Sequence, residues 1–209
     1  MSRPRAGRPT RDQQEQRHEE LLNVALDIFL ERGFEQTTMV DIATAVGMSK
    51  RTVYARYDDK AALFKAAVHR AIERYTIPRE ALEAVATDDL EETLAAVARL
   101  RAANAATPNS IRLQRILSAQ SYRFPELSHV AFEEGAGPGI TFLCDLFARH
   151  EARGEISVPQ PARAASAFLS LALGGTARAL VTGNSVHQDE VEERIAFAVG
   201  LFMGGVRLR

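Results

Sequence analysis

The 209-residue sequence predicts an all-α protein, and three observations support that prediction. Apolar residues recur three and four positions apart along most of the chain, which is the period of an amphipathic helix. No segment of useful length alternates apolar and polar residues as a half-exposed strand would. The composition is rich in alanine, which favours helix, and glycine and proline residues divide the chain into segments of helical length.

The first predicted helix runs from about Gln14 to Arg32. Its apolar residues return at helical spacing, and Gly33 follows them as a C-cap. After a short connector, Thr38 is expected to cap a second helix, because Asp41 stands three positions later as the acidic half of a capping box. The chain therefore begins with one long helix and one short helix.

Two further helices are expected before residue 76. Gly47 ends the second helix and tolerates the left-handed backbone that a tight turn needs. Ser49 caps a short third helix that ends near Tyr57, and Asp58 or Asp59 caps a longer fourth helix. Two helices separated by a short turn with a glycine are typical of a helix-turn-helix.

Basic residues are concentrated in two parts of a chain whose net charge is −1. The first eleven residues contain four arginines and no acidic residue, and residues 47–75 contain seven basic residues, including every lysine of the protein. Such clusters suit a partner that carries phosphate groups, although a solvated basic face is the alternative interpretation. The third helix adds to this pattern because its outward positions are rich in hydrogen-bond donors.

The segment ALDIFLERGFEQTTMVDIATAVGMSKRTVYARYDDKAALF, residues 25–64, resembles the DNA-binding domain of the tetracycline-repressor (TetR/AcrR-like) family. The resemblance rests on an apolar helix closing on Gly-Phe, a pair of threonines, Ile-Ala…Val-Gly-Met-Ser, Thr-Val-Tyr…Tyr and Lys-x-x-Leu-Phe. These pieces occur in order and at the right spacing over about a third of the chain. One departure is Tyr54-Ala55-Arg56-Tyr57, where the family often has an aromatic residue after the first tyrosine.

The resemblance implies a double-stranded DNA operator as partner, with the third helix in the major groove. Side chains of that helix would then meet bases or phosphates, Thr38 would meet a phosphate, and Tyr57 with Lys60 would clamp the backbone. The alternatives are that Thr38 is only a cap, that Arg51 is only solvated, and that the tyrosines are packing residues. The predicted DNA-binding residues are Thr38, Ser49, Lys50, Arg51, Thr52, Tyr54, Arg56, Tyr57 and Lys60.

Residues 1–13 are predicted to form a flexible basic arm. Gly7-Arg8-Pro9 resembles the core of an AT-hook, so Arg5 and Arg8 are candidates for the minor groove. The residue before that glycine is alanine rather than arginine, and a disordered tail that adds non-specific affinity is the alternative. The helix-turn-helix domain is expected over 14–75.

Residues 76–209 are expected to form a C-terminal helical domain, which the resemblance assigns to ligand binding and homodimerisation. A helix over 161–182 has small residues on several faces and is expected to form a dimer seam with 189–204, the alternative being an ordinary core helix. The other helices are expected near 79–86, 89–104, 110–122, 126–134 and 139–153.

A small-molecule pocket is expected between the helices of this domain. Its proposed walls are apolar, and each has plain core packing as an alternative. Three polar residues, Arg115, Gln120 and Arg178, are possible anchors for a ligand. The candidate wall residues are Leu113, Leu117, Tyr122, Phe142, Leu146 and Phe168.

Enzymatic and membrane functions are not expected. The five histidines lack metal-ligand spacing, the single cysteine excludes an intramolecular disulfide, and no metal or cofactor is predicted. No uninterrupted apolar run approaches about 20 residues, and no secretory signal is present, so a cytoplasmic location is expected. The favoured function is a ligand-responsive transcriptional regulator, most often a repressor in this family, released by a small, largely apolar effector. A helical adaptor or ligand-binding protein without specific DNA binding is the alternative.

Overall fold

The computed structural model describes residues 10–208, and the regular elements among these residues are helices. The chain divides into two compact units between Ala71 and Ile72, inside the fourth helix and before the predicted boundary at residue 75. The expected minor-groove residues Arg5 and Arg8 lie outside the described residues. The last residues of the expected arm, from Arg11 onward, already belong to the first helix.

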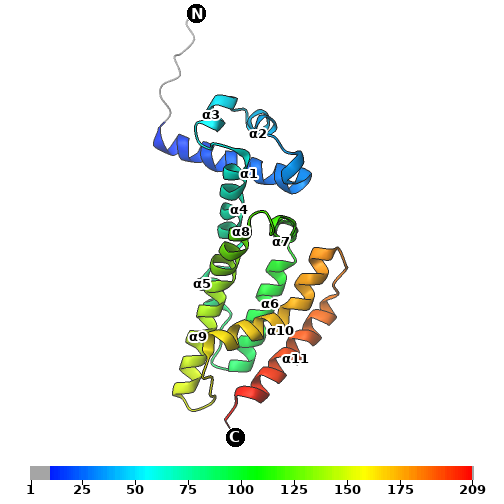
Figure 1. Ribbon diagram of the computed structural model, residues 1–209. Helices are drawn as coiled ribbons and strands as arrows, with labels where there is room; N and C mark the ends of the chain where they lie inside the picture. The colour runs from blue at the N-terminus through cyan, green and yellow to red at the C-terminus, as the bar shows by residue number, and fades with distance from the viewer. Residues whose placement is uncertain (1–9, 209) are drawn as a thin grey trace, which may run out of the picture. The chain divides into compact units, whose positions relative to one another are not determined.

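The N-terminal unit contains three helices and most of a fourth (Figure 1). They are α1 (Arg11–Gln36), α2 (Met39–Ala45), α3 (Lys50–Tyr54) and α4 (Lys60–Tyr75). Gly33, expected as the C-cap, instead forms a kink inside α1 with φ 78° and ψ 167°, and the helix continues for a last turn to Gln36 with Thr37 as its C-cap. Gly47 has φ 64° in the turn between α2 and α3, which confirms the predicted left-handed residue.

Side chains cap these helices as the sequence predicts. Thr38 and Asp41 form a reciprocal capping box at α2, and the Ser49 hydroxyl accepts a hydrogen bond at the start of α3. Asp59, rather than Asp58, accepts a bond from the amide of Ala62 at 2.7 Å and so caps α4. The third helix ends at Tyr54, earlier than predicted. The amides of Arg56 and Tyr57 both donate to the carbonyl oxygen of Val53, which forms a turn instead of continuing the helix.

Three phenylalanines form the centre of the N-terminal core. Phe29, Phe34 and Phe64 are at most 2% exposed. The ring of Phe64 meets each of the other two edge-on at a centroid distance of 5.0 Å. This geometry is favourable for aromatic pairs and joins α1 to α4.

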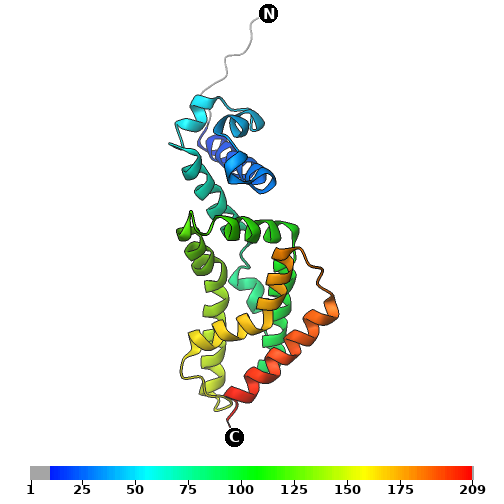
Figure 2. The ribbon, with the colours of Figure 1, turned by 45° about the vertical axis from the view of Figure 1, so that its right-hand side comes forward.

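The C-terminal unit contains the rest of α4 and eight further helical elements among the described residues. They are α5 (Arg79–Ala84), α6 (Leu90–Ala105), α7 (Pro108–Gln120), α8 (Pro125–Val130), the π-helical η1 (Ala131–Ala136), α9 (Gly137–Ala152), α10 (Pro161–Thr182) and α11 (Gln188–Val206). The bounds of α10 agree with the prediction, and those of its neighbours differ by a few residues. Figures 1 and 2 both show α10 and α11 side by side, and the two helices are in contact.

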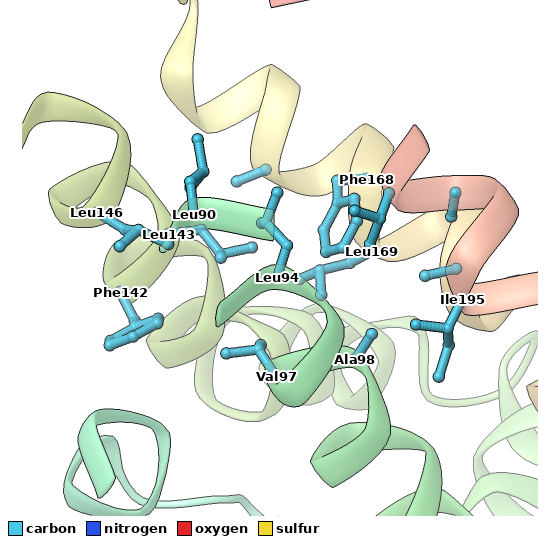
Figure 3. Packing of buried hydrophobic residues seen from close by; sticks show 14 of the residues in the cluster. Leu90, Leu94, Val97, Ala98, Phe142, Leu143, Leu146, Phe168, Leu169 and Ile195 are labelled. Carbon is cyan, nitrogen blue, oxygen red and sulfur yellow. The ribbon is translucent and has the colours of Figure 1, made fainter. Parts of the chain in front are cut away.

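Helix α6 lies at the centre of the C-terminal core. Leu94, Val97 and Ala98 are fully buried there, and they face residues of α9, α10 and α11 (Figure 3). The core therefore closes around one helix, which sequence periodicity alone does not single out.

The gap between the helices expected near 126–134 and 139–153 implied that the glycine-rich segment from Gly135 to Gly139 breaks the chain, and this expectation is wrong. The backbone continues from α8 through the wide turn of η1 into α9. Pro138 is tolerated because it lies in the first turn of α9, where its missing amide hydrogen has no helical partner. π-helical turns inserted between α-helical segments often occur at functional sites.

Helix α10 is, among the described helices, the one long and apolar enough to cross a membrane by length and composition alone. It contacts α6, α7, α9 and α11 within the C-terminal unit. Packing on several sides requires apolar residues on several faces, which accounts for its composition.

Candidate functional site

The short helix α3 presents a polar surface and buries a single apolar residue. Val53 is fully buried, whereas Lys50, Arg51 and Tyr54 are exposed, Tyr54 to 42%. The predicted contact residue Arg56, just beyond the helix, is exposed as well. One face of α3 thus holds the helix to the unit and leaves the donor-rich face open to solvent.

The basic side chains of this surface have no acidic partner. Among residues 10–208, none forms an ion pair with Lys50, Arg51 or Arg56. Lys50 lies over the ring of Tyr54, with its Nζ 5.6 Å from the ring centroid. Three cations within seven residues produce a local positive potential that suits a phosphate-bearing partner.

Other predicted contact residues are engaged within the protein. The hydroxyl of Thr38 donates to Asp41 at 2.7 Å and accepts from its amide at 3.1 Å. The hydroxyls of Ser49 and Thr52 bond each other at 2.7 Å, and Ser49 also accepts from the amide of Thr52. Thr38 and Ser49 thus cap the starts of α2 and α3, which for Thr38 agrees with the alternative interpretation as a helix cap.

Lys60 has a clear structural role. Its Nζ donates to the backbone carbonyls of Phe34 at 2.7 Å and Glu35 at 3.2 Å, and it lies 4.3 Å from the Phe34 ring centroid. A cation at the C-terminal end of a helix satisfies orphan carbonyls and opposes the helix dipole. The ammonium group predicted to hold a DNA phosphate therefore ties the start of α4 to the end of α1.

Tyr57 also has a partner inside the unit. Its hydroxyl lies 2.6 Å from Nε2 of His18 in α1, and the two rings are stacked. Burial, followed by the charge of Arg56, lowers the pKa of His18, and burial raises the pKa of Tyr57. Both groups are therefore neutral at pH 7. No local sequence pattern marks His18, which lies 39 positions from its partner.

The C-terminal unit contains a cavity of about 440 Å³ between α4, α6, α7, η1, α9 and α10. This size is within the range of small-molecule sites. The predicted wall residues Leu113 and Leu117 line it from α7. Phe132 and Ala136 of the π-helical turn line it as well, so the irregular helix shapes one of its walls.

The other predicted wall residues lie elsewhere. Phe142, Leu146 and Phe168 are at most 1% exposed and belong to the core around α6 rather than to this cavity (Figure 3). Tyr122 is 100% exposed, so its assignment to a pocket wall is wrong. Hydrophobic residue type predicts burial, but it does not separate a core position from a cavity wall.

The charged residue at the cavity is Arg101 of α6, which was not among the residues predicted from the sequence. Nε of Arg101 is shielded from solvent and has no hydrogen-bond partner. Among the proposed polar anchors, Arg115 instead donates to the carbonyl oxygens of Val181 at 2.9 Å and Leu180 at 3.1 Å. It therefore caps the end of α10, and neither Gln120 nor Arg178 lines the cavity.

Exposed apolar side chains occur on both α10 and α11, and they are called the apolar strip below. Phe197 and Leu201 of α11 are 64% and 58% exposed and stand one helical turn apart, and Leu171 of α10 is 37% exposed. The space beside Gly204 of α11 is open, so nothing within the described chain covers the backbone there. Exposed large apolar side chains beside glycines are typical of a surface that another helix covers.

No group of three or more metal-ligating side chains occurs among residues 10–208.

Two family models match the chain. The model described as the C-terminal domain of AefR-like transcriptional repressors matches residues 92–205, which is more than half of the chain. The model described as bacterial regulatory proteins of the tetR family matches residues 21–67, which include α2 and α3.

Individual proteins are similar over most of their length. The HTH-type transcriptional repressor BepR of Brucella suis biovar 1 is 25% identical over 179 residues, which are 80% of this chain and 82% of BepR. A TetR-family regulator from Mesorhizobium loti has a TM-score of 0.79 at 25% identity, covering 96% of this chain and 100% of that one. The flavonoid-responsive regulator FrrA has a TM-score of 0.74 at 27% identity, covering 93% and 99%.

The contrast between two lysines of the N-terminal unit is testable. Lys60→Met removes two hydrogen bonds from a cation to carbonyl groups, so we expect it to lower the free energy of unfolding of this unit by about 1–2 kcal/mol. Lys50→Met, the matched control on an exposed site, should change it by less than about 0.5 kcal/mol. Urea unfolding followed by tyrosine fluorescence measures both. Equal stability of the two variants would contradict the structural role of Lys60.

Proposed function

The chain belongs to the tetR family of bacterial regulatory proteins, which are DNA-binding regulators, and we propose that it is a homodimeric repressor released from its operator by a small molecule. The observation that carries the DNA-binding part is the surface of α3, which combines a buried anchor, Val53, with exposed cations that have no acidic partner among the described residues. Such a surface presents donors to base edges and phosphates. The protein would act in the cytoplasm, where the operator lies.

Within this surface, different residues have different proposed tasks. Arg51, exposed near the start of α3, is the candidate for reading a base, because arginine can pair with both acceptors of guanine in the major groove. Lys50, Tyr54 and Arg56 are candidates for phosphate or base contacts. The remaining predicted contacts support the surface by capping helices or, in the case of Tyr57 and Lys60, by joining α3 and α4 to α1.

The homodimer is supported by the apolar strip on α10 and α11. Phe197 and Leu201 would be covered by the same strip of a second copy, since a two-fold interface repeats one surface on both subunits. Gly204, on the same helix, permits close approach of a second helix. Two copies are also needed because one five-residue helix reads too few bases for specificity, and half-sites lie about 34–36 Å apart.

The ligand response is supported by the cavity and by the continuity of α4. Lys60 begins this helix in the N-terminal unit, whereas Ile72 and Tyr75 at its other end line the cavity. A ligand that prefers one position of Ile72 and Tyr75 would displace the helix that continues to the DNA-binding unit. A largely apolar effector fits the lining, and FrrA, a structural relative, is described as flavonoid-responsive. Only a difference in affinity between the two states can drive release.

Arg51→Ala tests the DNA-reading surface. Fluorescence anisotropy with the DNA upstream of the protein's own gene should show a loss of about 1–3 kcal/mol, with little change on random DNA. Arg112→Ala, an exposed arginine of α7 in the C-terminal unit, is the matched control and should bind like the wild type. If Arg51→Ala weakens binding to both DNAs equally, or to neither, the base-reading role fails.

Phe197→Glu tests the dimer. A carboxylate in the centre of the apolar strip would be desolvated on association, so the dimer dissociation constant should rise by at least about tenfold. Tyr122→Glu, at a fully exposed site in the turn after α7, should leave association unchanged. Sedimentation velocity across a concentration series measures both, and a Phe197→Glu protein that dimerises like the wild type would exclude this surface as the interface.

A further inference from the structure

We propose that the cavity of the C-terminal unit binds an amphipathic organic anion, a small carboxylic acid with an apolar body, whose carboxylate pairs with Arg101. This inference rests on the proposed function and deepens it, because it gives the chemical class of the effector. It starts from a charge in an otherwise uncharged lining. Among the described residues that line the cavity, Arg101 is the one that carries a charge.

The guanidinium of Arg101 has no counter-ion within residues 10–208. No hydrogen bond or ion pair joins it to another described residue, and its Nε is both shielded from solvent and without a partner. Burial is the cause that lowers its pKa, and no neighbouring carboxylate opposes that effect. Arginine nevertheless stays charged in proteins. A partly buried charge without a partner costs free energy, which an anion in the cavity would offset.

The surrounding chain makes room for this side chain. A Cβ placed on Gly139 of α9 would lie 2.5 Å from one terminal nitrogen of Arg101, so a side chain at 139 would displace the guanidinium. Gly139 follows the π-helical turn whose residues form another wall of the cavity. The glycine-rich segment that was expected to break the chain thus provides the space that Arg101 occupies.

The rest of the lining favours an anion with an apolar body over a small inorganic ion. Apolar side chains, many of them leucine, isoleucine and alanine, dominate the walls, while Ser166 and Ser170 stand one turn apart on α10 with no hydrogen-bond partner among the described residues. The volume of about 440 Å³ suits a molecule larger than phosphate or acetate. A planar guanidinium pairs with a carboxylate through two parallel hydrogen bonds, which gives orientation as well as affinity.

The test is direct binding of matched acids and amides to the full-length protein in the absence of DNA. The probes are octanoate and 4-phenylbutyrate, each compared with its primary amide by isothermal titration calorimetry. Wild type should bind at least one acid about tenfold or more tightly than its amide, as expected for a charge-assisted bond. Arg101→Gln should lose this preference, Arg101→Lys should retain part of it, and the control Arg112→Gln should behave like the wild type.

A second measurement separates ligand binding from a purely structural role. Because Arg101 has no partner among the described residues, Arg101→Met should leave the melting temperature of the ligand-free protein unchanged or raise it. A clear fall would show that the arginine holds the fold and would overturn the inference. Equal binding of acids and amides, a preference that survives in Arg101→Gln, or no binding of either acid to the wild type at about 1 mM would overturn it as well.

These outcomes are independent of DNA release. An acid that binds through Arg101 but leaves operator affinity unchanged supports this inference and counts against the proposed ligand-driven release. A protein that is released from DNA by an uncharged molecule, with no preference for acids, keeps the proposed function and loses this inference.

Discussion

The proposed DNA-reading surface depends on one constraint: α3 has five residues and cannot be stable alone. Forming a single helical turn costs more backbone entropy than its few hydrogen bonds return, so tertiary contacts must hold it. Val53 supplies the buried anchor, Gly47 the turn, and Ser49 the cap. Because these residues fix the helix, the backbone that carries the exposed basic side chains is positioned in the absence of DNA.

The same constraint explains why several polar residues near α3 are occupied inside the protein. Lys60 closes the end of α1, and the Tyr57–His18 pair joins the segment after α3 to the same long helix. In the C-terminal unit, by contrast, a charged residue is left without a partner within residues 10–208. The core around α6 is closed and apolar, whereas Arg101, on the same helix, is left without a partner among the described residues beside a cavity. A group that reduces stability in this way is more readily explained by binding than by folding.

The sequence was sufficient to predict the helical fold, the caps and the turn, because each depends on residues within a few positions of one another. The box of Thr38 and Asp41 and the positive φ of Gly47 are examples. Contacts between distant residues were not predictable in this way. Tyr57 and His18 are far apart in sequence, and Arg101 resembles any surface arginine until α9 packs beside it. The glycine-rich segment from Gly135 to Gly139 was wrongly predicted, because it stays helical and Gly139 gives room to the Arg101 side chain instead of forming a turn.

Selection of binding sequences from a random duplex library is the sharpest test of base reading by α3, because it can be carried out before any operator has been identified. We predict that the full-length protein enriches an inverted repeat, with half-sites about 34–36 Å apart from centre to centre, as two copies of α3 on one face of DNA require. Enrichment of no sequence, with binding that depends on salt alone, would show that the exposed basic surface of α3 attracts phosphate without reading bases and would contradict the proposed role of this helix.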